Sequence, residues 1–397
     1  MAVKFTKPEI NVREKLAELD KPSGIAGEAM LRAETPQEQF NLIGAGRRNM
    51  IINGDMQISQ RGTSFAAVNG TYSLDRYIFW NTIGAFTITQ DSDAPPGFGS
   101  SLKLDCTTAN ASPSASSYIE MQQRIEGYNL QALKKGSSDA LPVTLSFWVK
   151  TNKTGTYQVN LIDYSTAGPR TMGMSYDVTT ADTWQKITIT FPRDAIGEFA
   201  NSNANALAID WWWGSSSTYG GGGTTQTSWG TMVQNLRNGA GTVNLGDSTA
   251  NYFNMTGVQL ELGKVATPFE HRSYGEELAL CQRYFYKAPT STGYMFTLTG
   301  VHATLGEIQY FPPVTMRTTP TIALLDASPY WEVYPWNTVG NNSINITSIH
   351  AGHMSPDGHG QLGIFFSGTS GSYVTPNLVR GVNYVIQADF CSFDSEL

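Results

Sequence analysis

After residue 48, hydrophobic and polar residues alternate in short runs that are separated by turn residues. The clearest run is VTLSFWVKTN at residues 143–152, where every second residue from Val143 to Val149 is hydrophobic. The runs GTYQVNLIDY, WQKITITF and YFNMTGVQLEL repeat the pattern, with Gly, Asn and Asp between them. A period of two residues is typical of a half-buried β-strand. Residues 49–272 are therefore predicted to form a β-sandwich.

Residues 1–48 follow a helical pattern instead. NVREKLAELDKPSG begins at a capping residue, Asn11, and ends at Pro and Gly. TPQEQFNLIGAG combines a capping Thr35 with Glu38 three residues later, and it also ends at Gly. Two such short helices cannot bury a core of their own, so they need a partner, either another copy of the chain or a separate protein. We interpret this segment as an N-terminal anchor.

A second helical pattern interrupts the alternation at HRSYGEELALCQRYFYK, residues 271–287. Its hydrophobic residues recur at helical spacing from Leu278 to Phe285, and Ser273 with Glu276 forms a capping-box pair. Strands and turns return after it. The predicted organisation is an N-terminal attachment segment (1–48), a β-sandwich (49–272), a linking helix (273–287) and a C-terminal β domain (288–397).

Composition agrees with a mainly all-β protein. The chain of 397 residues has 39 glycines, 11% aromatic residues and only 15% charged residues. A net charge of −7 argues against nucleic acid as a partner, because phosphate binding relies on an excess of Lys and Arg. No apolar run is long enough to insert across a membrane, and the N-terminus has no apolar signal core. The three cysteines are widely spaced, which favours buried, reduced thiols and synthesis in a cytoplasm.

The run LAIDWWWGSSSTYGGGG at residues 207–223 sets three tryptophans against a loop of Ser and Gly. Alternation places Trp211 and Trp213 on the predicted core face. Trp212 falls on the other face beside an aspartate, and Tyr219 follows in the loop. An exposed or half-exposed indole there suits either stacking on a sugar or packing against another subunit, and the sequence leaves both open. Trp212 and Tyr219 are therefore candidate carbohydrate-binding residues.

A second aromatic segment, DASPYWEVYPWNTVGNN, lies in the C-terminal β domain. Tyr330, Trp331 and Trp336 are crowded into it between turn residues. Rings beside Asn and Asp suit sugars, whose hydroxyls accept and donate hydrogen bonds, but the same rings suit an inter-subunit contact. We take these three residues as the carbohydrate-binding candidates of the C-terminal β domain, which would be the distal tip if residues 1–48 are the anchor.

Catalytic chemistry finds little support. A glycan depolymerase needs two carboxylates about 5–10 Å apart across the scissile bond. The available acids are Asp163, Asp194, Glu198 and Asp210, and nothing in their spacing selects a pair. No G-x-S-x-G, H-E-x-x-H or phosphate-binding loop motif is present. We expect no catalytic residues, although such a site can also be built from distant residues or across subunits.

Metal binding is also not expected. SIHAGHMSPDGHG contains His350, His353, Asp357 and His359, but their spacing matches no established metal site. A structural calcium ion near Asp55 stays an open alternative, but the sequence shows no acidic loop that requires one. We therefore predict no metal and no cofactor.

Two stretches carry a resemblance to a known family. NMIINGDMQISQRG at residues 49–62 and VQLELGKVATPFEHRSYGEELALCQRYFY at residues 258–286 resemble tail-fibre and tailspike proteins of tailed bacteriophages. The first looks like the opening strand, and the second like the closing strand and exit helix, of a jelly-roll domain similar to carbohydrate-binding modules. YFPPVTMRTTPTI is similar to the C-terminal β domain that often follows in such fibres. The resemblance covers roughly residues 46–325.

The resemblance implies an elongated homotrimer in the tail of the virion, made in the host cytoplasm. Residues 1–48 would attach it to the phage tail or to an adaptor protein, and the β domains would adhere to a bacterial surface glycan without cleaving it. The alternatives are a tailspike depolymerase and a purely structural fibre or decoration protein. Leu278, Cys281 and Phe285 are the candidate trimer contacts, unless this stripe covers the edge of its own sandwich.

Overall fold

The computed structural model describes residues 48–166, 168–287, 312–324 and 391–397, and the strands at 294–302, 305–310, 331–335, 342–344, 346–351, 362–368 and 378–383. The predicted anchor therefore lies outside the described residues, apart from Arg48. Four sheets are present in the described parts of the chain, and every strand pairing within them is antiparallel.

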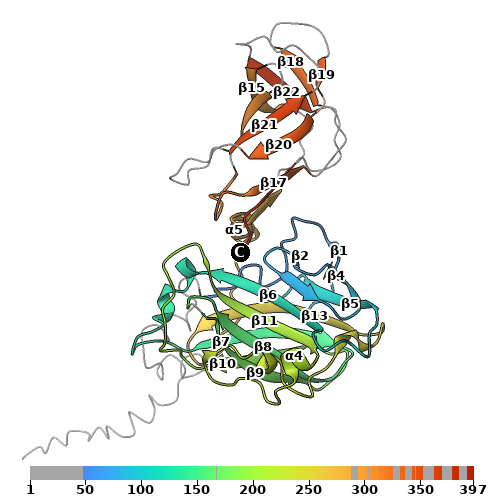
Figure 1. Ribbon diagram of the computed structural model, residues 1–397, viewed down its shortest axis with the longest axis vertical. Helices are drawn as coiled ribbons and strands as arrows, with labels where there is room; N and C mark the ends of the chain where they lie inside the picture. Colours follow the sequence, from blue (N-terminus) through green and yellow to red (C-terminus); the bar gives the residue numbers. More distant parts are fainter. Residues whose placement is uncertain are drawn as a thin grey trace, which may run out of the picture.

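Two of these sheets form the β-sandwich that the alternation predicted (Figure 1). Sheet A has the strand order β1 (Ser64–Ala66), β4 (Ala85–Asp91), β5 (Ser101–Thr108), β13 (Tyr252–Leu262), β7 (Val143–Thr151) and β10 (Gln185–Phe191). Sheet B has the order β12 (Gly230–Thr231), β9 (Arg170–Val178), β8 (Gly155–Asp163), β11 (Asn205–Ser215), β6 (Tyr118–Glu126), β3 (Ile78–Asn81) and β2 (Thr71–Tyr72). Most neighbours are not consecutive in sequence, so the chain crosses repeatedly between the two sheets.

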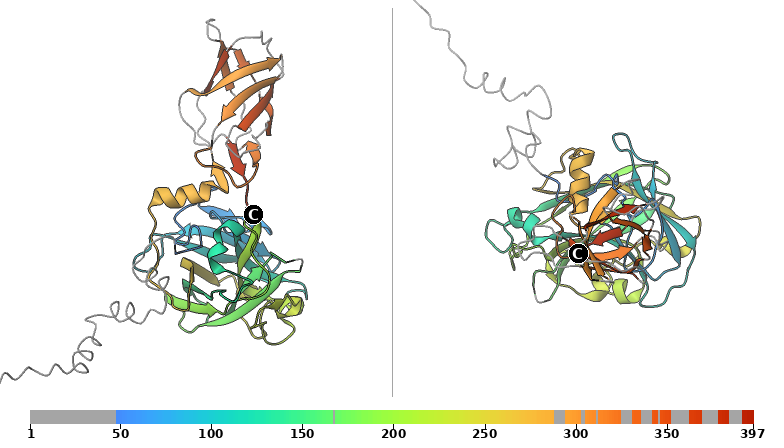
Figure 2. Two further views of the ribbon diagram at one scale, coloured as in Figure 1. Left: turned by 90° about the vertical axis from the view of Figure 1, so that its left-hand side faces the viewer. Right: turned by 90° about the horizontal axis from the view of Figure 1, so that it is seen from above.

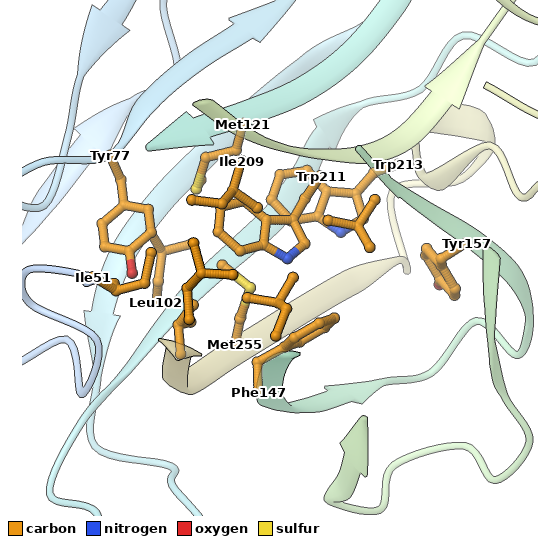
Figure 3. Close-up of a cluster of buried hydrophobic side chains, with 14 of the residues drawn as sticks. Ile51, Tyr77, Leu102, Met121, Phe147, Tyr157, Ile209, Trp211, Trp213 and Met255 are labelled. Atoms are coloured by element: carbon orange, nitrogen blue, oxygen red, sulfur yellow. The ribbon is translucent and has the colours of Figure 1, made fainter. Parts of the chain in front are cut away.

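The core lies between the two sheets, as Figure 3 shows. Every second residue of β7 from Val143 to Val149 is buried in it, which confirms the predicted inward face. Trp211 and Trp213 of β11 are also buried there, as alternation predicted. The ring of Trp211 meets that of Phe147 edge to face, with centroids 6.2 Å apart. Large aromatic rings from both sheets thus fill the space between them.

The stretch at residues 49–62, which resembles an opening strand, is irregular and belongs to neither sheet. It is held instead against β13. Met50 N–H donates to the carbonyl of Leu260 (2.9 Å), and Val258 N–H donates to the carbonyl of Gly54 (2.8 Å). A β-carbon on Gly54 would lie 2.2 Å from the Val258 carbonyl oxygen, so this close approach requires glycine.

Helix α5 (Tyr274–Gln282) begins at the predicted capping box. The Ser273 side chain accepts from the backbone N–H of Glu276, and the Glu276 carboxylate accepts from the backbone N–H of Ser273 (3.0 Å). The helix is shorter than the predicted 273–287, because Phe285 leaves it to start a strand, β14 (Phe285–Lys287). No helix within the described residues combines the length and apolar composition that crossing a bilayer requires.

Beyond α5 the chain forms two further sheets. Sheet C has the order β14, β23 (Cys391–Asp394) and β17 (Thr321–Leu324). Sheet D has the order β19 (Asn342–Ile344), β18 (Trp331–Pro335), β22 (Leu378–Asn383), β15 (Tyr294–His302), β16 (Leu305–Tyr310), β21 (Leu362–Gly368) and β20 (Ile346–Ala351). Sheet C lies between the sandwich and sheet D in both side views (Figures 1 and 2).

The residues after β23 return to the sandwich. Glu396 forms a buried ion pair with Arg76, whose guanidinium lies 3.4 Å from the centroid of the Tyr284 ring. The carbonyl of Leu397 accepts hydrogen bonds from Tyr72 Oη (2.8 Å) and from Arg124 Nη1 (2.6 Å). Sheet C is thus connected to the sandwich twice, through α5, which leads into β14, and through residues 395–397, which follow β23.

Candidate functional site

The outer face of sheet B carries a cluster of polar and aromatic side chains. Because successive residues of a strand point to opposite faces, Asp210 and Trp212 of β11 lie on the side away from the core. Trp212 pairs with Glu120 of β6 on one side and with Gln158 of β8 on the other. Three neighbouring strands therefore bring an acid, an indole and an amide together.

Arg237, from the loop after β11, closes over this face. Its Nη2 atom lies 2.8 Å from Glu120 Oε2 and 2.9 Å from Asp210 Oδ2. Trp212 Nε1 donates to the same carboxylate of Asp210 (2.9 Å), and the Arg237 guanidinium stacks 4.8 Å from the indole centroid. One arginine thus binds both acids and covers the indole between them.

Burial dominates the electrostatics of this cluster. It raises the pKa of Glu120 well above its usual value and raises the pKa of Asp210, while Arg237 opposes both shifts. The nearby Asp210 carboxylate adds to the rise in the pKa of Glu120, because two like charges lie close together. The single positive charge of Arg237 therefore faces two buried carboxyl groups.

The loop from Ser216 to Asn244 is held down beside Arg237 as well. The carbonyl of Arg237 accepts from Asn160 Nδ2 (2.6 Å), and Asn238 Nδ2 donates to Ser215 Oγ (2.9 Å). The loop contains the one-turn helix α4 (Ser217–Gly220) and a short 3-10 turn at Gln234–Leu236. Polar side chains of the sheet therefore fix the path of a loop that is rich in Gly and Ser.

Two tyrosines form the accessible part of the cluster. The ring of Tyr219 in α4 lies 5.0 Å from the ring of Tyr118 at the start of β6, in an edge-to-face arrangement, and 5.6 Å from the ring of Trp212. Both tyrosines are half-buried, whereas Trp212 is only 1% exposed. The expectation of an open or half-open indole at Trp212 is therefore corrected in the single chain, because Arg237 and Tyr219 cover it. Tyr118 and Tyr219 are the rings of the cluster that keep part of their surface exposed.

The four acids considered for catalysis are distributed over the sandwich. Asp210 shares Arg237 with Glu120, as described above, and Glu198 is exposed. Asp163 and Asp194 share Lys135, whose Nζ lies 2.7 Å from Asp163 Oδ2 and 3.5 Å from Asp194 Oδ2. Arg170 adds a two-pronged contact to Asp194, at 3.0 and 2.9 Å.

A cavity of about 30 Å³ adjoins this second pair of acids, and Phe199 and Trp229 contribute to its otherwise mostly aliphatic lining. That volume suits one or two water molecules rather than a sugar ring. Both acid pairs are thus bound to cations: Glu120 and Asp210 share Arg237, whereas Asp163 and Asp194 share Lys135.

The remaining predicted residues lie as follows. Cys281 and Phe285 are buried, and Cys281 packs within the same chain against Ile52 and Ile58, with half-buried Leu278 beside them. Asp55 is buried, its Oδ2 accepts a hydrogen bond from Gln57 Nε2 (2.5 Å), and burial raises its pKa.

The candidates of the C-terminal β domain are described only in part. Trp331 lies in β18 and His350 lies in β20, and only the strand backbone is described at both positions. The candidates outside the described residues are Tyr330, Trp336, His353, Asp357 and His359.

Sequence reasoning missed Glu120, Arg237 and Tyr118. Alternation in YIEMQQRIE was the available signal, since it places Tyr118 and Glu120 on the same outer face. It does not show that β6 is the neighbour of β11, which begins at Asn205, 79 residues after β6 ends at Glu126. Nothing in the loop sequence marks Arg237 as the residue that folds back.

Comparisons with known proteins give structural similarity only. No protein-family model matches the chain, and no curated protein matches its sequence. The enzymatically active domain of bacteriophage CBA120 tailspike protein 4 matches at 14% identity over 54% of this chain and 21% of that chain, with a TM-score of 0.30. This chain therefore spans about a fifth of that domain's length.

Two carbohydrate-binding modules also match. The family 11 module of the cellulosomal cellulase Lic26A-Cel5E of Clostridium thermocellum does so at 10% identity over 51% of this chain and 95% of the module, with a TM-score of 0.26. TmCBM61, solved with β-1,4-galactotriose, matches at 10% identity over 54% and 99%, with a TM-score of 0.27. At these identities and TM-scores the similarities establish neither a family nor a function for this chain.

Proposed function

We propose that this protein is a tail-fibre subunit of a tailed bacteriophage that adheres to a bacterial surface glycan without cleaving it. The observation that carries the adhesion is the outer face of sheet B. There Tyr118 and Tyr219 present two half-buried rings 5.0 Å apart. Beneath them lies the Arg237 cluster, which consists of Arg237, Glu120, Asp210 and Trp212. Sugar C–H faces stack on aromatic rings, and the two tyrosine hydroxyls supply hydrogen-bonding groups at the edge of the same surface.

The surface is prearranged for binding. Tyr219 lies in a one-turn helix whose loop is fastened to the sheet by Arg237 and Asn238. A ring that is already held in place loses little conformational entropy when a ligand stacks on it. Single sites of this kind are weak, and three copies in a trimeric fibre would make them effective through multivalency.

Adhesion is favoured over cleavage by the state of the acids. Glycoside hydrolysis needs two carboxyl groups on either side of a bound sugar, with space between them. Arg237 occupies the space between Glu120 and Asp210, and Lys135 occupies the space between Asp163 and Asp194. The depolymerase alternative would therefore need either displacement of these cations or acids contributed across subunits.

The phage assignment rests on the two stretches that resemble fibre proteins. Although they lie about 200 residues apart in the sequence, they form one hydrogen-bonded unit: Leu260 N–H donates to the Asn49 side chain (3.0 Å), and Asn53 N–H donates to the Glu277 carboxylate (2.5 Å). This unit joins the start of the sandwich to its last strand and to α5. The pairing gives a structural reason why the two motifs occur together.

The test compares variants of the full chain on a panel of immobilised bacterial surface polysaccharides, measuring retained protein and released reducing sugar together. Tyr219→Ala and Tyr118→Ala are each expected to weaken binding by about tenfold or more, which corresponds to about 1.4 kcal/mol. Tyr128→Ala is the matched control, because Tyr128 is 53% exposed and lies in the 3-10 turn (Gly127–Asn129) that follows the far end of β6. Release of sugar would make the protein a depolymerase. Equal binding by all three folded variants would remove the sheet B surface as the glycan site.

A further inference from the structure

The outer face of sheet A carries a second group of aromatic and charged side chains, on the opposite side of the sandwich from Tyr118 and Tyr219. Trp148 and Lys150 of β7 both point away from the core, since Val149 between them is buried. Lys186 of β10 pairs with Trp148, and Asn254 of β13 pairs with Lys150. Trp148 is half-buried and Lys186 is exposed, so this face is open to solvent in the single chain.

Asp93 organises the group. Its Oδ1 accepts a hydrogen bond from Trp184 Nε1 (3.1 Å), and its Oδ2 lies 2.7 Å from Lys150 Nζ. The hydrogen bond from Lys150 lowers the pKa of Asp93, so the carboxylate is ionised at neutral pH. The Trp184 indole is thereby held by its edge, while Asp93 and Lys150 keep 44% and 21% of their side chains exposed.

A second ring stands next to this arrangement. Tyr252 Oη donates to Asp182 Oδ1 (2.5 Å), and Asp182 is two residues before Trp184. Lys103 Nζ lies 5.5 Å from the centroid of the Tyr252 ring and 3.0 Å from Asp105 Oδ2. Both rings are half-buried and both are anchored through their polar atom to an exposed carboxylate.

We propose that this surface, defined by Trp184, Asp93, Lys150 and Tyr252, is a second carbohydrate-binding site. A sugar ring would stack on the anchored indole. The free lone pairs of Asp93 would accept from sugar hydroxyls, and Lys150 would donate to a ring or hydroxyl oxygen. Because each partner is already fixed by a hydrogen bond or ion pair, little conformational entropy is lost on binding.

The charge pattern favours a sugar over other partners. Cores of protein–protein interfaces are depleted of charged residues, whereas here the Lys150–Asp93 pair lies at the centre and the rings lie around it. Nucleic acid is disfavoured because Asp93, Asp105 and Asp182 share the surface with the lysines. The site stands on different residues from the sheet B surface and does not depend on it.

With sites on both faces of the sandwich, one chain would bind two glycan strands or two parts of one strand. Even if each site is weak, holding one site bound raises the effective concentration of ligand at the other to the millimolar range where the spacing allows it. Loss of either site should then weaken binding to a dense glycan surface by a larger factor than it weakens binding of a short oligosaccharide in solution, which occupies one site at a time.

The test uses the full chain and the same polysaccharide panel. Trp184→Ala and Lys150→Ala are expected to weaken binding by about tenfold or more, and Trp184→Phe, which keeps a ring but loses the hydrogen bond to Asp93, by less. Lys153→Ala is the matched control, because Lys153 forms a similar ion pair with Asp247 and is 23% exposed. Circular dichroism and thermal melting establish that each variant is folded.

A readout without mutation accompanies these measurements. Oxidation of Trp184 by N-bromosuccinimide, followed by mass spectrometry, should slow severalfold when the bound polysaccharide is present. If Trp184→Ala binds normally and Trp184 is not protected, the second site is refuted. A change in oligomeric state with unchanged glycan binding also refutes it, in favour of a subunit interface.

The outcomes separate this proposal from the proposed function. If Tyr219→Ala abolishes binding and Trp184→Ala has no effect, the sheet B surface stands and the sheet A site falls. If Trp184→Ala and Lys150→Ala alone weaken binding, the sheet A site stands and the sheet B surface falls. Additive losses in the Tyr219→Ala/Trp184→Ala double variant support both.

Discussion

The Arg237 cluster gives the sharpest prediction about stability. Arg237→Met keeps the length of the side chain but removes the charge that compensates Glu120 and Asp210. Both acids are buried, and the Arg237 side chain is only 11% exposed. Breaking a buried ion pair by removing one partner costs about 3–5 kcal/mol, because an uncompensated charge is left in a low-dielectric environment. We expect a loss of this size in the free energy of unfolding at pH 7.

The assay is urea unfolding followed by tryptophan fluorescence, since the Arg237 guanidinium stacks directly on Trp212. The triple variant Arg237→Met/Glu120→Gln/Asp210→Asn should recover at least half of the loss, because no charge is then stranded. The loss in Arg237→Met should also shrink at pH 4.5, where the carboxyls take up protons.

A matched control separates burial from ion pairing as such. Lys153→Met breaks the Lys153–Asp247 pair, whose side chains are 23% and 35% exposed. Exposed pairs contribute about 0–1 kcal/mol, so this variant should change little. If Arg237→Met costs no more than Lys153→Met, or if the triple variant is no more stable than the single one, the reasoning from desolvation is refuted.

Three further predictions concern single positions. Gly54→Ala should lower the free energy of unfolding by about 1–3 kcal/mol, because the added methyl meets a carbonyl oxygen of β13 at 2.2 Å. Gly99→Ala is the control and should be tolerated, because Gly99 has open space around it. Chemical unfolding of the two variants measures the difference. Ser273→Ala should cost about 1 kcal/mol and speed hydrogen exchange in the first turn of α5, and unchanged exchange would contradict the role of the capping box. Glu120→Gln tests the direction of a pKa shift. The folded state raises the pKa of Glu120 above the unfolded value of 4.5. The contribution of Glu120 to the free energy of unfolding is therefore fully present below that pH and is lost as the pH rises through the folded pKa. The stability of Glu120→Gln relative to the native chain should therefore increase from pH 5 to pH 8, and a constant difference would contradict the shift.

Local sequence determined which residues form strands and which face of each strand is buried. Val143 to Val149 and the pair Trp211 and Trp213 were placed in the core by alternation alone, because a strand separates its two faces at every residue. The capping box at Ser273 was equally readable, since both of its partners lie within one turn of helix. These features depend on residues that are close in sequence.

Tertiary structure alone decided what lies on the outer face of each sheet. Whether Trp212 is open depends on Arg237, which arrives from a loop 25 residues later, and on β6 lying next to β11. The carboxyl pair of Glu120 and Asp210 depends on the same strand order. A period of two residues tells a buried face from an outer one, but it carries no information about which strands are neighbours or which loop covers them. Burial and charge pairing at the candidate sites were therefore decided by long-range contacts.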